Sequence, residues 1–168
     1  ASRIYAPMSR TRIRRKVTQL ITTKTMIITT DILADRFAKY NKLYFDDELP
    51  TPDFFLLKSY SKLGMFRFIE IPSRRKIKYV KILISCYYDW TEEQLRSVLV
   101  HEMIHYYVER NYFHNGQPQH GELFTNKMNE LNEKYDLNIS VVTDINKLKV
   151  AKGSPILPRI VAFFTTLR

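Results

Sequence analysis

The sequence predicts an α+β fold in which an antiparallel three-stranded sheet packs with about three helices. Three strand-like runs, at residues 54–60, 65–71 and 78–86, follow one another between segments with helical periodicity. The chain has 168 residues, of which 45% are hydrophobic and 13% are aromatic. This length and composition are typical of one globular domain with a buried core and some length left over for terminal extensions.

The first expected helix begins near Thr30 or Asp31 and covers the stretch TDILADRFAKYNKLYF. Phe37, Tyr40 and Tyr44 recur along this stretch at the spacing of one helix face. Two prolines follow in DDELPTP, and proline cannot continue a helix because it lacks a backbone N–H group. The helix is therefore expected to end before DDELPTP.

The second strand-like run, MFRFIEI, has the alternation of a half-buried strand. Phe66 and Phe68 stand on either side of Arg67, so apolar and charged side chains point to opposite faces. The stretch PSRRK at residues 72–76 is expected to form an exposed, basic hairpin connection to the third strand at 78–86.

The second expected helix begins with a capping box. Thr91 can cap the first turn, and Gln94 can reach back to the Thr91 backbone. This helix is expected to run through about Tyr112 and to end near Asn115 and Gly116.

A third helix is expected over residues 119–135, with Phe124 and Leu131 on its apolar face. Beyond residue 140 the pattern leaves three readings open: an additional strand, a segment packed on the core, or an appendage.

The charge of the chain points to an anionic partner. There are 27 Lys and Arg residues against 17 Asp and Glu residues, so the formal net charge is +10. This excess supports association with nucleic acid or with another polyanion. The alternative is an inert basic surface. The candidate contacts lie in a basic arm at residues 1–25 and in the hairpin connection. They are Arg12, Arg14, Arg15, Lys16, Arg74, Arg75 and Lys76.

Cysteine usage and hydropathy indicate an intracellular, cytoplasmic protein. Cys86 is the single cysteine, so neither a disulfide framework nor a cysteine-rich zinc ribbon can form. No apolar run approaches the roughly 18 residues of a membrane span, and the basic N-terminus lacks the apolar stretch of a secretory signal. No membrane association is expected, and nothing in the sequence indicates an oligomeric state.

The stretch HEMIH within the second helix carries the strongest chemical signal. His101 and His105 are four residues apart and share one helix face, so both imidazoles can bind one metal ion. Glu102 follows the first histidine, where a zinc-bound water would lie. The alternative is a structural pair of histidines. A metzincin pattern would need Gly and His at the positions of Val108 and Asn111, so that pattern is absent.

A catalytic zinc ion takes three protein ligands and leaves one position open. His120 is the favoured third ligand, because it follows a loop containing Gly and Pro and stands four residues before Phe124 on the apolar face of the third helix. His114 is the weaker candidate, since the chain would have to double back sharply. Glu122 remains a further alternative, although it would leave His120 without a role.

Four stretches together resemble the SprT-like zinc metalloproteases, a family that includes the Spartan proteases. They are FAKYNKLYFDDELP (37–50), SKLGMF (61–66), VLVHEMIHYYV (98–108) and QHGELF (119–124). The resemblance covers about residues 26–140. It implies a zincin-like minimal metalloprotease domain with the HExxH helix at its core. On this reading, residues 1–25 are the basic arm and 141–168 are a C-terminal extension of unclear role.

The resemblance also implies the roles of individual residues. His101, His105 and His120 match the family's ligands for one Zn²⁺ ion, and Glu102 matches its catalytic glutamate. The chain departs from the family at Gln119, where Gly is frequent. It also lacks the cysteines of the zinc ribbon in some bacterial members, and the DNA- and partner-binding modules of the Spartan proteases have no evident counterpart.

These observations predict a zinc-dependent endopeptidase that acts on protein or peptide substrates. The resemblance implies that these could be DNA-associated or DNA-crosslinked proteins. The third strand, 78–86, is similar to the edge strand along which zincins bind an extended peptide. The alternative function is a nucleic-acid-binding module whose zinc site is structural or catalytically silent.

Overall fold

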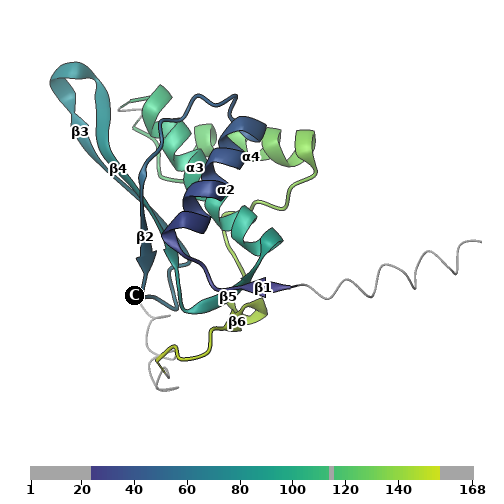
Figure 1. Ribbon diagram of the computed structural model, residues 1–168. Helices are drawn as coiled ribbons and strands as arrows, with labels where there is room; N and C mark the ends of the chain where they lie inside the picture. Colours follow the sequence, from purple (N-terminus) through teal and green to yellow (C-terminus); the bar gives the residue numbers. More distant parts are fainter. Residues whose placement is uncertain (1–23, 114–115, 156–168) are drawn as a thin grey trace, which may run out of the picture.

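The computed structural model describes residues 24–113 and 116–155 (Figure 1). These residues form an α+β fold of three α-helices and two small three-stranded sheets, which confirms the predicted fold class. The helices are α2 (Thr30–Tyr44), α3 (Glu92–Asn111) and α4 (Glu122–Tyr135). All three expected helices are therefore present, and α4 begins three residues later than the sequence predicts.

The larger sheet consists of β2 (Asp53–Leu57), β3 (Gly64–Ile71) and β4 (Lys76–Ser85), in the order β2-β4-β3. β3 and β4 are antiparallel and are joined by a short 3-10 turn, Pro72–Arg74. This hairpin extends away from the helices (Figure 1).

The expectation of a wholly antiparallel sheet is wrong, because β2 pairs with β4 in parallel. The connection at residues 58–63 explains the difference. It passes over the end of β4, where the Ser85 amide donates to the Leu63 carbonyl and the Cys86 amide donates to the Leu57 carbonyl. The chain therefore does not turn back beside β2, and β2 and β3 lie on opposite sides of β4.

This order also corrects the expectation that residues 78–86 form an edge strand. β4 is the central strand and is paired on both sides, and β3 is an edge of the sheet. The apolar run KILIS fits a central strand, since Ile82 and Ile84 are fully buried.

A second, smaller sheet holds the two ends of the described chain together. It consists of β1 (Thr25–Met26), β5 (Tyr88–Thr91) and β6 (Lys149–Val150), in the order β1-β5-β6. Leu148 and Ala151, on either side of β6, are buried. Part of the chain beyond residue 140 thus contributes a short strand and packs on the domain.

Helix α3 runs through the centre of the fold and contacts both β3 and β4 as well as α2 and α4. The predicted capping box is confirmed: the Gln94 amide donates to the Thr91 hydroxyl, and the Thr91 amide donates to the Gln94 side chain. The residues of α3 that are fully buried in the core are Leu95, Leu99, Val100, Met103 and Ile104. The HExxH motif therefore lies on the most enclosed helix of the fold.

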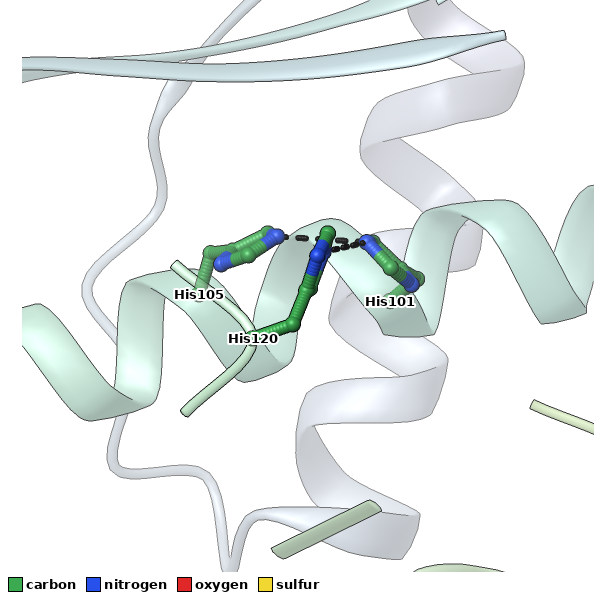
Figure 2. A group of neighbouring side chains, drawn as sticks. All are labelled: His101, His105 and His120. Carbon is green, nitrogen blue, oxygen red and sulfur yellow. Dashed lines mark hydrogen bonds between the residues drawn. The ribbon is translucent and has the colours of Figure 1, made fainter. Parts of the chain in front are cut away.

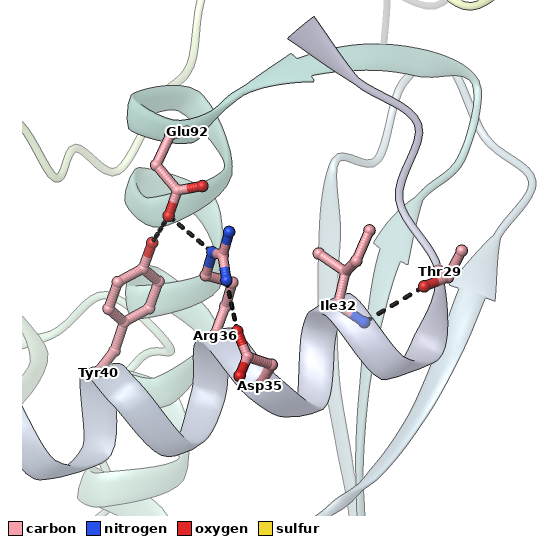
Figure 3. Close-up of polar contacts among 6 residues, drawn as sticks. All are labelled: Thr29, Ile32, Asp35, Arg36, Tyr40 and Glu92. Carbon is pink, nitrogen blue, oxygen red and sulfur yellow. Dashed lines mark hydrogen bonds and ion pairs between the residues drawn. The ribbon is translucent and has the colours of Figure 1, made fainter. Parts of the chain in front are cut away.

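A polar cluster fixes the start of α3 against α2 (Figure 3). Arg36 and Tyr40 of α2 donate hydrogen bonds of 2.7 and 2.9 Å to the same oxygen of Glu92. Arg36 also pairs with Asp35. At the start of α2, the hydroxyl of Thr29 accepts a hydrogen bond from the Ile32 amide. These contacts set the position of α3 relative to its neighbours.

Candidate metal centre

The three predicted histidine ligands come from two segments that the fold brings together. His101 and His105 lie one turn apart on the same face of α3. His120 lies in the turn just before α4, rather than within the helix as the sequence predicts. Gly121 makes this turn, and its amide donates to the Pro118 carbonyl. A Cβ on Gly121 would lie 2.8 Å from the Gln117 side chain, so only glycine fits there without a shift.

The imidazole nitrogens converge on one point (Figure 2). The Nε2 atoms of His105 and His120 each lie 3.1 Å from Nε2 of His101. One ligand nitrogen from each of the three rings lies within 4.8 Å of the others. Two nitrogens bound tetrahedrally to one zinc ion would be about 3.3 Å apart. The spacing therefore fits a metal ion held by three imidazoles.

Contacts behind the rings fix their orientation. Nδ1 of His101 lies 3.0 Å from the Ser140 carbonyl, which can only accept, so Nδ1 carries the hydrogen and Nε2 is free to bind a metal. The buried ring of Phe124 packs against all three imidazoles, with centroid distances of 4.8, 4.5 and 4.8 Å to His101, His105 and His120. The aromatic floor and the carbonyl thus preset the three ligands.

The surroundings keep the imidazoles of His101 and His105 neutral. Burial lowers the pKa of His101 to about 4, although the hydrogen bond to Ser140 acts in the opposite direction. Burial and the neighbouring histidines lower the pKa of His105 to about 3. Neutral imidazole is the form that binds metal ions, so both groups are ready for coordination near neutral pH.

Glu102 lies on the side of α3 that faces β3 and is only 6% exposed. Burial raises the pKa of its carboxyl group to about 8, and a hydrogen bond from the Phe66 amide partly opposes this shift. Gly64 leaves the space that the carboxylate occupies, because a Cβ there would be 2.3 Å from Oε1 of Glu102. A carboxyl group in this setting can gain and lose a proton near neutral pH.

An open cleft of about 470 Å³ runs between β3 and the histidines. The edge strand β3 contributes one wall and α3 contributes the floor. The lining residues are Lys62, Gly64, Met65, Phe66, Arg67, Phe68, His101, Glu102, His105, Glu109, Gln119 and His120. The three histidines and Glu102 therefore face the same solvent-accessible space beside β3, the edge strand of the sheet that the described residues form.

A comparison with protein families matches the model of the SprT-like family over residues 33–143, which is more than half of the chain. The chain belongs to the SprT-like family. It is therefore a metallopeptidase, and His101, His105 and His120 match the family's zinc site, an HExxH motif with a distal third histidine. No curated protein and no solved structure matches the chain in the corresponding comparisons.

The alternative metal ligands and the predicted nucleic-acid contacts lie apart from the histidine cluster or outside the described residues. Glu122 is the first residue of α4 and does not belong to the cluster that the described residues form. Arg74, Arg75 and Lys76 are exposed at the hairpin turn. The remaining candidates lie outside the described residues. They are Arg12, Arg14, Arg15, Lys16 and His114.

Three residues of the SprT-like site were missed by sequence reasoning: Gly64, Phe124 as an aromatic floor, and Ser140. A signal existed for Gly64, because it directly precedes the strand-like run at 65–71, and an isolated glycine in a strand indicates a close approach by another group. Ser140 acts through its backbone carbonyl, which any residue would supply.

Within the described residues no helix is long and apolar enough to cross a membrane.

Proposed function

We propose that this chain is a zinc-dependent endopeptidase in which Glu102 is the general base and then the general acid. The observation that carries the proposal is the position of Glu102. Its carboxyl group is buried against Gly64 and Phe66, and it lines the same cleft as the three histidines. A carboxylate beside a metal site is suited to move a proton between an attacking water and a leaving group.

His101, His105 and His120 would hold the zinc ion. When bound, the ion supplies a Lewis acid that polarises the scissile carbonyl and acidifies a water molecule. Glu102 would accept a proton from that water and pass it to the nitrogen of the leaving amine. The raised pKa of Glu102 supports both steps, since a pKa near 8 allows the group to accept and return a proton near neutrality.

The edge strand β3 would hold the substrate in an extended conformation. Among the described strands β3 pairs with β4 alone, and its residues 64–68 line the cleft above the histidines. An extended peptide can add to such an edge through main-chain hydrogen bonds, which bind it with little regard to sequence. This mode would leave the scissile bond directly above His101 and Glu102.

The donor set favours catalysis over a structural role for the metal. A structural zinc site is generally four-coordinate and rich in cysteine, whereas a catalytic site has three protein ligands and an open position. The cluster found in the described residues has three histidines, and Cys86, the single cysteine of the chain, is not part of it. The donor set does not exclude a zinc site that has lost catalysis, so the alternative of a catalytically silent site is tested by measuring cleavage.

The test is Glu102→Gln, which keeps the size of the side chain and removes its ability to accept a proton. We expect this variant to bind zinc as the wild type does and to lose cleavage of an unfolded protein substrate. Glu93→Gln, an exposed residue of the same helix, is the matched control and should leave both properties unchanged. Wild-type zinc content without any cleavage would favour the silent-site alternative.

We further propose that the substrates are proteins associated with or crosslinked to DNA. The exposed cations of the hairpin turn, Arg74, Arg75 and Lys76, support a contact with phosphate groups, as does the +10 net charge. Binding of this kind weakens as the salt concentration rises. For duplex DNA, each lost phosphate contact makes the negative slope of log K against log salt shallower by about 0.9.

The DNA proposal is tested by replacing all three hairpin cations with serine and measuring duplex binding between low and moderate salt. The triple variant should bind more weakly and show a smaller salt slope than the wild type. The control replaces three exposed lysines outside the hairpin, namely Lys42, Lys134 and Lys152. Equal loss in both triple variants would point to a general charge effect and count against a hairpin contact.

A further inference from the structure

A second cavity of about 310 Å³ adjoins the cleft at His101 and Glu102. It opens at the beginning of β3 and does not include His105 or His120. The residues that line it are Ser61, Lys62, Leu63, Gly64, Val98, His101, Glu102, Ser140, Val141, Val142, Thr143 and Ile145. This cavity shares His101, Glu102 and Gly64 with the cleft, but His105, His120 and the rest of β3 do not line it.

The wall opposite β3 is apolar and exposed. Val141, Val142 and Ile145 are 41%, 81% and 42% exposed, whereas Leu63 and Val98 form a buried base. Several exposed apolar side chains around one concave site beside reacting groups are typical of a ligand-binding site rather than of a random surface. An apolar group placed there would remove these side chains from water.

Hydrogen bonds fix this wall to the helices that carry the metal ligands. The Asn132 side chain of α4 donates to the Ile139 carbonyl and accepts from the Ile139 amide, both at 2.9 Å. Ser97 of α3 donates to the Asn138 carbonyl at 2.9 Å. Within the wall itself, the Ser140 hydroxyl donates to the Val142 carbonyl at 2.7 Å. The cavity is thus formed before any substrate binds.

The charges at the cavity favour apolar over basic groups. Lys62 lies at its rim, and Glu102 is the single acidic residue among the lining residues. Glu102 is 6% exposed and its carboxyl group accepts a hydrogen bond from the Phe66 amide, so little of it is accessible to an incoming cation. A lysine or arginine side chain would meet Lys62 and an apolar wall, and it would be rejected.

The direction of β3 indicates which part of a substrate reaches the cavity. β3 runs from Gly64, at the cavity, to Ile71, at the hairpin turn. Antiparallel pairing is the more stable arrangement for an added strand. A peptide in that arrangement would run toward Gly64, so residues on the C-terminal side of the scissile bond would lie at the cavity.

We propose that this cavity is a specificity subsite that takes a leucine, methionine or phenylalanine side chain immediately after the scissile bond. The subsite deepens the proposed peptidase function and rests on it. It also assigns a role to residues 141–145: their apolar side chains select the substrate.

The experiment uses the full chain with zinc and a mixture of peptides randomised around the cleavage position, with products identified by mass spectrometry. Val142→Glu is the informative variant, because Val142 is highly exposed and its replacement does not disturb the core. Val150→Glu, an exposed valine on β6 away from the cavity, is the matched control.

We expect the wild type and Val150→Glu to prefer apolar residues directly after the cleaved bond. Val142→Glu should lower kcat/KM for the apolar peptide by about tenfold relative to a peptide with lysine at that position. Preferences at other positions should not change. Cleavage without an apolar preference, or a preference that Val142→Glu leaves intact, would overturn the subsite alone. A zinc-loaded wild type that cleaves no peptide would overturn the proposed function and the subsite with it.

Discussion

A Cβ atom on Gly64 would lie 2.3 Å from Oε1 of Glu102, closer than such atoms approach in real proteins. The two residues come from different elements, the edge strand β3 and the helix α3, and each limits the other. The strand supplies the Phe66 amide that holds the carboxyl group, and the missing side chain at residue 64 supplies its space. The backbone of β3 therefore helps to position the Glu102 carboxyl group.

Gly64→Ala should displace the Glu102 carboxyl group and reduce peptide cleavage by roughly 100-fold, because a misplacement of about 1 Å can cost that much. The metal site should persist, so zinc content is measured alongside kcat/KM. A double-mutant cycle with Glu102→Gln separates this effect from a general loss of structure. If Gly64→Ala lowers the zinc content of the Glu102→Gln protein, the substitution acts on the fold rather than on Glu102.

Asn132→Ala should weaken zinc binding by up to about 10-fold, because it loosens the segment that carries the Ser140 carbonyl, the direct partner of His101. The Asn132 side chain holds Ile139, whose neighbour Ser140 accepts the hydrogen bond from His101. Zinc affinity is measured by competition with a chelating dye. Asn129→Ala, an exposed residue on the same helix, should bind zinc like the wild type. Equal affinities in all three proteins would rule out a role for Asn132 in positioning His101.

The Glu92 cluster predicts a pH-dependent contribution to stability. Burial alone would raise the pKa of Glu92, but hydrogen bonds from Arg36 and Tyr40 outweigh it and hold the pKa below its ordinary value of 4.5. The folded state therefore favours the carboxylate. Its stabilising effect is present above pH 4.5 and is lost as the pH falls through the lowered folded-state pKa.

Glu92→Gln should reduce the free energy of unfolding by about 1 kcal/mol at pH 7, since the group is partly exposed and the pairing is screened by solvent. Chemical denaturation at pH 7 and pH 3 measures the difference, which should shrink at the lower pH. Glu93→Gln controls for the loss of a negative charge in the first turn of α3. A difference between wild type and Glu92→Gln that stays constant with pH would contradict the role of the carboxylate.

Local sequence patterns were sufficient to predict the helices and the cluster of three histidines. His101 and His105 share a helix face by periodicity alone. The capping box at Thr91 fixed the start of α3 within one residue. His120 was favoured over His114 because the intervening loop permits a reversal, and His120 does lie beside His101 and His105, whereas His114 is outside the described residues. These features depend on interactions within about 20 residues of chain, which the sequence displays directly.

The strand order could not be predicted in the same way. Whether residues 58–63 turn back beside β2 or pass over the end of β4 depends on backbone pairing with Ser85 and Cys86, which lie more than 20 residues away in sequence. The contact between the Ser140 carbonyl and His101 could not be predicted from the sequence either, because every residue carries the same backbone carbonyl. The lone glycine at residue 64 was not used as a signal, and nothing in the sequence pairs it with Glu102.

We propose that His101, His105 and His120 together hold one zinc ion. The most direct test is the metal content of the purified wild type and of His120→Ala, measured by mass spectrometry under conditions that keep the protein folded. We expect one zinc ion per wild-type chain and its loss from the variant, with the circular dichroism spectrum unchanged. A variant that retains the full zinc content would contradict the assignment of His120 as the third ligand.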